Sequence, residues 1–149
     1  MKKIQKTSNK ERCLLYLKRY ADKDLEGVAN LFAHDIVLRD WKIRVVGKQK
    51  AVSETKKNFE AAESLMIDVL STYENEQTIA TELKIVVNNI EELYVVDVIT
   101  FNAEGLISSI RAYLGKGDNW LKQVHKKSPS NGAFFISKKH SLKHHRGGN

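Results

Sequence analysis

An acidic residue interrupts the most apolar stretch of the chain. Asp97 lies in the run LYVVDVITF, residues 93–101. In an extended strand Asp97 shares a face with Val95, Ile99 and Phe101, which we expect to point into the protein. A carboxylate among apolar neighbours resists ionisation, so its pKa should rise, and such groups concentrate at functional sites. Local hydrogen bonds that satisfy the carboxylate, or a register slip that turns it outward, are the alternatives.

Asp40 and Tyr16 are two further candidates. Asp40 ends a short predicted strand just before Trp41, which would place its carboxyl at the mouth of whatever the sheet encloses. Tyr16 lies in the first predicted helix, three positions from Cys13. Taken singly, Asp40 fits a solvated turn residue, and Tyr16 fits an amphipathic helix residue whose hydroxyl faces water.

The remaining reactive side chains predict no metal site and no cofactor. Cys13 is the only cysteine, so it cannot form an internal disulfide, which fits a reducing compartment. Its place in an apolar helical stripe favours buried packing over reactivity. His34, the only histidine before the C-terminal tail, lies beside Asp35 and is expected to be a surface or capping group.

Hydrophobic periodicity divides the chain into helices followed by strands. Ser8 can cap the first helix, with Glu11 as its capping-box partner. Asp24 can cap a second helix, and Gly47 precedes a third. The expected helices are 8–21, 24–33 and 48–62, and the expected extended segments are 35–40, 44–46, 64–74, 77–87, 91–102 and 105–115.

The last four strands are joined by short turns, which makes neighbouring strands antiparallel. Helices followed by such a meander predict an α+β fold, with the helices packed on one face of a curved antiparallel sheet. The strand at 91–102 is apolar on both faces, so the face with Tyr94, Val96 and Val98 needs a second cover. The simplest cover is a twofold homodimer.

Charge separates a folded body from a tail. Residues 1–115 hold 17 Lys/Arg and 17 Asp/Glu, so the net charge of +7 lies in residues 116–149. We predict one domain over 1–115 and a basic tail over 116–149, disordered from Lys126 onward, with a possible helical turn at 119–125. No apolar run is long enough for a membrane span and we find no signal peptide, so we expect a cytoplasmic protein.

Two motifs resemble the ketosteroid isomerase and SnoaL-like polyketide cyclase families of the nuclear transport factor two superfamily. The first is YLKRYADKDLEG at 16–27, followed by LFAHD at 31–35. The second is DVITFNAEGLI at 97–107, continued by RAY at 111–113. With Gly47 and its helix, the resemblance covers nearly all of residues 8–115. It implies a cone-shaped barrel with one pocket.

The resemblance also assigns roles to the three candidates. In ketosteroid isomerases a tyrosine on the first helix and a protonated aspartic acid on a late strand hold an oxyanion, and an aspartate after the first strand moves the proton. The resemblance places these three roles on Tyr16, Asp97 and Asp40, respectively. In ketosteroid isomerases the aspartic acid of the oxyanion site stays neutral and donates a hydrogen bond, so the resemblance implies the same for Asp97.

This chain also departs from the family pattern. Trp41 follows the base where the isomerases have proline, and no tyrosine on the third helix matches the second phenol of those enzymes. The nearest candidates are Thr55 and Phe59, so the substrate need not be a steroid.

The function expected is isomerisation or cyclisation of a small, flat, apolar carbonyl compound. Arg111 should point away from the pocket; if it pointed inward, its pairing with Asp97 would suggest epoxide hydrolysis. A non-catalytic dimeric binding module of the same fold is one alternative. A nucleic-acid or protein adaptor that uses the basic tail is another, less favoured because no nucleic-acid motif is present. The expected ligand-contacting residues are Phe32, Trp41, Leu83, Ile85, Leu93, Val95, Ile99, Ile110 and Leu114.

Overall fold

The computed structural model describes residues 7–118. The expectations for a helical turn at 119–125 and for a disordered tail lie outside the described residues. The elements are α1 (Asn9–Ala21), α2 (Leu25–Ala29), β1 (Phe32–Arg39), β2 (Arg44–Val46), α3 (Lys48–Ala61), β3 (Leu65–Asn75), β4 (Thr78–Val87), β5 (Glu91–Phe101) and β6 (Ile107–Gly115).

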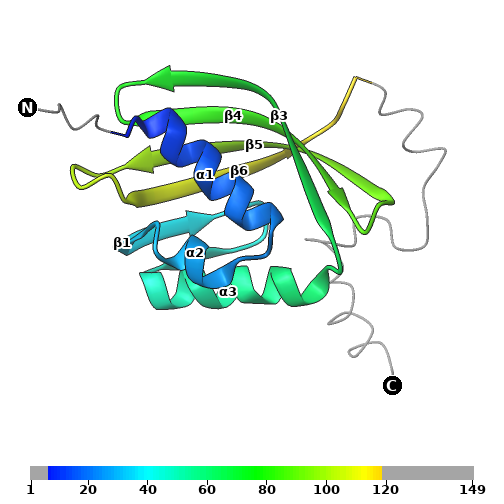
Figure 1. Cartoon of the computed structure of the whole chain (residues 1–149), viewed down its shortest axis with the longest axis horizontal. Helices are drawn as coiled ribbons and strands as arrows, with labels where there is room; N and C mark the ends of the chain where they lie inside the picture. Colours follow the sequence, from blue (N-terminus) through cyan, green and yellow to red (C-terminus); the bar gives the residue numbers. More distant parts are fainter. Residues whose placement is uncertain (1–6, 119–149) are drawn as a thin grey trace, which may run out of the picture.

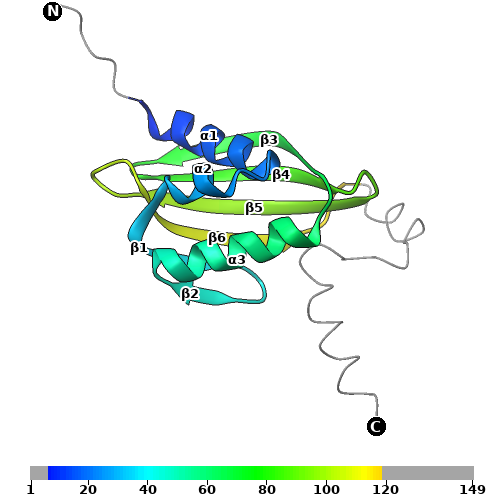
Figure 2. The same cartoon turned by 60° about the horizontal axis from the view of Figure 1, so that its bottom comes forward.

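The helices lie on one face of a curved, six-stranded, unclosed sheet, as the α+β prediction required (Figures 1 and 2). The strand order is β2-β1-β6-β5-β4-β3. Strands β3 to β6 form the expected antiparallel meander. The sheet is not wholly antiparallel, however, because β1 pairs with β6 in parallel. This pairing joins the N-terminal third of the body to its last strand.

Local signals explain two of the element boundaries. The Ser8 hydroxyl accepts a hydrogen bond from the Glu11 backbone N–H at 3.1 Å, which caps α1. The turn between β4 and β5 places Asn88 and Asn89 at positive φ, a conformation that asparagine tolerates and that suits a tight hairpin.

The second helix is shorter than expected. We predicted a helix over 24–33 and a strand from 35, but α2 ends at Ala29 and β1 begins at Phe32. The Leu31 carbonyl accepts a hydrogen bond from the Ile107 N–H at 2.8 Å, and Phe32 is paired with Ile107. Pairing with a distant strand therefore outweighs the local helical pattern.

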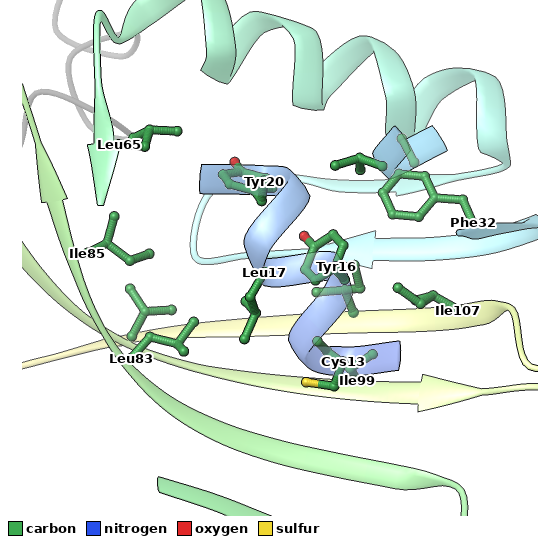
Figure 3. Packing of buried hydrophobic residues seen from close by; sticks show 14 of the residues in the cluster. Cys13, Tyr16, Leu17, Tyr20, Phe32, Leu65, Leu83, Ile85, Ile99 and Ile107 are labelled. Atoms are coloured by element: carbon green, nitrogen blue, oxygen red, sulfur yellow. The ribbon is translucent and has the colours of Figure 1, made fainter. Parts of the chain in front are cut away.

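The core fills the space between α1 and the concave face of the sheet (Figure 3). Strand β5 alternates as expected, with Val95, Asp97 and Ile99 buried and the intervening side chains half-buried. The largest fully buried side chains are Phe32, Ile36, Ile79, Leu83, Ile99, Ile107 and Ile110. No helix among residues 7–118 is long and apolar enough to cross a membrane.

Candidate functional site

One pocket opens between the helices and the concave face of the sheet. It holds about 600 Å³ of empty space, the space at its mouth included. Helices α1 and α3 contribute one side, the β1–β2 turn another, and strands β3 to β6 the floor. The lining residues are Tyr16, Leu17, Tyr20, Leu38, Asp40, Trp41, Ile43, Glu54, Thr55, Asn58, Ile67, Leu83, Ile85, Val95, Asp97, Ile110 and Ala112.

Asp97 lines this pocket from the middle of β5. Its neighbours in the sheet are Thr81 on β4 and Ala112 on β6. The residue is only 8% exposed, and burial raises the pKa of its carboxyl to about 7, with the nearby charge of Asp40 as a second cause. Its carboxyl forms no hydrogen bond with another residue of the described part of the chain. It is therefore an acid that a ligand can reach and that is half protonated near neutral pH.

Tyr16 reaches the same pocket from α1. Its ring lies 5.8 Å from the Tyr20 ring and 6.2 Å from the Phe32 ring, measured between centroids. Burial raises the pKa of the phenol well above its usual value, and the charge of Asp97 raises it further. The Tyr16 hydroxyl makes no hydrogen bond to any of residues 7–118. A neutral phenol of this kind is a hydrogen-bond donor for a ligand oxygen.

Asp40 follows directly after β1 and lines the pocket at the β1–β2 turn. Its Oδ1 accepts hydrogen bonds from the backbone N–H groups of Lys42 and Ile43, at 2.7 and 2.8 Å. The Asp40 backbone N–H in turn donates to the Ile43 carbonyl at 3.0 Å. Asp40 is therefore both a turn residue, as its position after the strand suggested, and a residue of the pocket. Its other carboxylate oxygen, Oδ2, makes no hydrogen bond within the described chain.

Several residues of the pocket lining were not expected from the sequence, and two of them, Tyr20 and Asn58, form a hydrogen bond with each other. Tyr20 lines the pocket one helical turn after Tyr16, and Asn58 on α3 donates a hydrogen bond to its hydroxyl at 3.1 Å. Thr81 does not line the pocket, but it lies beside Asp97 in the sheet, fully buried, and its hydroxyl has no partner among the described residues. The spacing of four between the tyrosines could have indicated Tyr20, since such residues share a helix face.

The expected ligand-contacting residues divide into two groups. Trp41, Leu83, Ile85, Val95 and Ile110 line the pocket. The others do not: Phe32, Leu93 and Ile99 are buried in the core, and Leu114 is 37% exposed near the end of β6. Strand alternation predicts which face a side chain takes, but it does not predict where along the strand the cavity ends.

The other reactive groups lie where we expected them. Burial raises the pKa of the Cys13 thiol to about 12, with the charge of Asp97 as a lesser cause, so it stays protonated in the core. Arg111 does not line the pocket, and His34 is exposed.

Within residues 7–118 no group of three or more histidine, cysteine or acidic side chains is placed to hold a metal ion.

Comparisons with known proteins identify the fold. No protein-family model and no curated protein matches the sequence. Among solved structures, an NTF2-like protein of unknown function from Cytophaga hutchinsonii superimposes with a TM-score of 0.64 at 10% identity, covering 74% of this chain and 93% of the other. The epoxide hydrolase/cyclase-like enzyme SalBIII, which acts in pyran ring formation in salinomycin, gives 0.64 at 19% identity, covering 72% and 90%.

A candidate ketosteroid isomerase from Kribbella flavida also matches, with a TM-score of 0.64 at 15% identity over 73% of this chain and 78% of the other. At such identities the likeness establishes a shared NTF2-like fold, found also in SnoaL-like proteins. The fold implied by the two sequence motifs is therefore confirmed. Because this fold serves several chemistries, the activity has to be argued from the pocket.

Proposed function

We propose that this chain binds a small apolar carbonyl compound in the pocket and isomerises it by proton transfer. The observation that carries the proposal is that Tyr16, Asp40 and Asp97 line one mostly aliphatic pocket. Two of them are buried hydrogen-bond donors without a partner in the described chain, and the third is a carboxylate. Oxyanion stabilisation and a base are the parts that such a reaction needs.

The steps follow from these groups. The unbonded oxygen of Asp40 takes a proton from the carbon next to the ligand's carbonyl, which leaves an enolate. The enolate oxygen accepts hydrogen bonds from the Tyr16 hydroxyl and from protonated Asp97. Asp40 then returns the proton to a different carbon, so that the double bond moves and the carboxylate is regenerated. The aliphatic walls keep water away from the enolate, which strengthens both hydrogen bonds.

The substitution Asp40→Asn tests the base. An amide oxygen can still accept the hydrogen bonds from Lys42 and Ile43, so the turn should survive while the base is lost. With a β,γ-unsaturated cyclic ketone as substrate, we expect the rate of conjugated enone formation to fall by a factor of about 100 or more.

Asp35→Asn is the matched control, because Asp35 is an exposed carboxylate on β1, the strand that Asp40 follows. It should leave the rate unchanged. Wild-type protein that binds the ketone but forms no enone would contradict the isomerase proposal and favour a non-catalytic binding module.

A further inference from the structure

A second polar position exists in the pocket, which the proposed proton transfer does not use. It consists of Tyr20 on α1 and Asn58 on α3, both of which line the pocket. The Asn58 side-chain amide donates to the Tyr20 hydroxyl at 3.1 Å. Figure 3 shows Tyr20 on the same helix as Tyr16, one turn further along the chain.

The geometry leaves the Tyr20 hydroxyl proton available to a ligand. The phenol oxygen accepts from Asn58, and among residues 7–118 no acceptor receives the phenol proton. Burial raises the pKa of Tyr20 above its usual value, and the charges of Asp97 and Asp40 add to this, so the phenol stays protonated. Tyr20 can therefore donate one hydrogen bond into the pocket.

Packing fixes the direction of that donor. The Tyr20 ring makes edge contacts with two other rings, at 5.8 Å from Tyr16 and 4.8 Å from Phe59 between centroids. Rings held on two sides lose little further freedom when a ligand binds, so a hydrogen bond from this hydroxyl is preorganised.

The charge of the pocket lining restricts which ligand groups can accept a hydrogen bond from Tyr20. Asp40, Glu54 and Asp97 line the pocket, and no lysine, arginine or histidine of the described chain does. A carboxylate or phosphate on the ligand would face these acids without a counter-charge. The partner of Tyr20 is thus a neutral oxygen, such as a ketone or a hydroxyl group.

We propose that the Tyr20–Asn58 pair binds a second oxygen of the ligand, so that the pocket selects flat apolar compounds with two neutral oxygens, diketones or hydroxyketones. The first oxygen occupies the Tyr16–Asp97 position, and this part rests on the proposed function. The second oxygen sets which end of the molecule enters first. Tyr20 then determines orientation, and with it which carbon faces Asp40.

Two naphthols test this inference by binding alone. The dissociation constants of 2-naphthol and 2,6-dihydroxynaphthalene are measured by fluorescence for the wild type and for Tyr20→Phe. One added hydrogen bond should make the wild type bind the dihydroxy compound about tenfold more tightly than 2-naphthol. In Tyr20→Phe this ratio should fall to about one, while the affinity for 2-naphthol stays nearly unchanged.

Two other substitutions separate the possible outcomes. Tyr73→Phe alters an exposed tyrosine on β3 and should change neither affinity. Tyr16→Phe should weaken both ligands by a similar factor and keep their ratio. A ratio that stays near ten in Tyr20→Phe, or a wild type that does not distinguish the ligands, overturns the inference.

If Tyr20→Phe does not fold, Asn58→Ala replaces it in the binding test. It removes the amide that positions the phenol, and the ratio should then fall by several-fold; an unchanged ratio again overturns the inference. Failure of the proposed function looks different, because a protein that forms no enone can still show the Tyr20-dependent ratio. That result would leave a two-point binding pocket without the isomerase.

Discussion

Asp97 connects the titration of several side chains in the pocket. Its carboxyl has a pKa raised to about 7 by burial and by the charge of Asp40. Burial is the main cause of the raised pKa values of Cys13, Tyr16 and Tyr20, and the charge of Asp97 raises each of them further. Each of these thiol and phenol groups is held in its neutral form. Ionisation of Asp97 thus removes one hydrogen-bond donor from the pocket and adds a negative charge beside the phenols of Tyr16 and Tyr20.

The stability of the protein should record this titration. In the unfolded chain Asp97 ionises near its ordinary value of 3.8, whereas in the folded protein it ionises near 7. Between these values the folded state binds more protons than the unfolded state, so the free energy of unfolding falls as pH rises. The loss amounts to about 4 kcal/mol from about pH 4 to about pH 8, and the contribution is constant above that.

Urea unfolding at several pH values checks this expectation. In Asp97→Asn the side chain at position 97 does not titrate. The variant should therefore gain stability relative to the wild type as pH rises from 4 to 7. Parallel curves for the two proteins would show that Asp97 titrates normally in the folded state.

At the scale of elements, Gly47 controls the entry into α3, the helix that brings Thr55 and Asn58 to the pocket. Its φ of 99° lies in a region that residues with a Cβ rarely adopt. Its N–H donates to the Ile36 carbonyl at 2.7 Å, and its own carbonyl accepts from Ala51 at 3.0 Å. The glycine therefore ties the start of α3 to β1.

Gly47→Ala should lower the free energy of unfolding by about 1–2 kcal/mol. The cause is backbone conformation alone, because a Cβ at this position meets no atom within 4 Å. Gly115→Ala is the control: its φ is not positive and the nearest atom to an added Cβ lies at 3.7 Å, so its stability should be nearly unchanged. Equal melting temperatures for Gly47→Ala and wild type would contradict this account.

Helices and strands could be predicted from the sequence where the contacts that fix their bounds are between residues close in the sequence. Period-two alternation identified β5 and placed Asp97 on its inner face, and the cap at Ser8 located the start of α1. The end of α2 was not predictable, because Phe32 pairs with a strand that begins 75 positions later, at Ile107. The Tyr20–Asn58 hydrogen bond joins residues 38 positions apart on two helices, so no local pattern contains it.

The whole molecule presents an outer sheet face that its helices do not cover. Met66, Tyr73 and Tyr113 are at least half exposed there, and Val96 and Val98 are half-buried in the single chain. In the sheet register Val96 lies between Glu82 and Tyr113, near the centre of this face. A homodimer through the face remains our prediction, because a second copy would cover its apolar strip.

Sedimentation of the full chain tests the dimer. We expect wild type to sediment as a dimer at micromolar concentration and Val96→Glu to sediment as a monomer, because the new carboxylate would be buried at the centre of the interface. Lys56→Glu, on the exposed side of α3, should remain dimeric. A wild type that is monomeric at every concentration would contradict the prediction.

The parallel pairing of β1 with β6 has a consequence for the order in which the chain can fold. Translation produces β1 long before β6, and β6 is the strand that joins β1 to the rest of the sheet. While the ribosome is still making β3, β4 and β5, the edge of β1 and the floor of the pocket have no partners. The nascent protein therefore exposes apolar strands until residue 115 emerges, and we expect slow, late closure in which chaperone binding competes with β6.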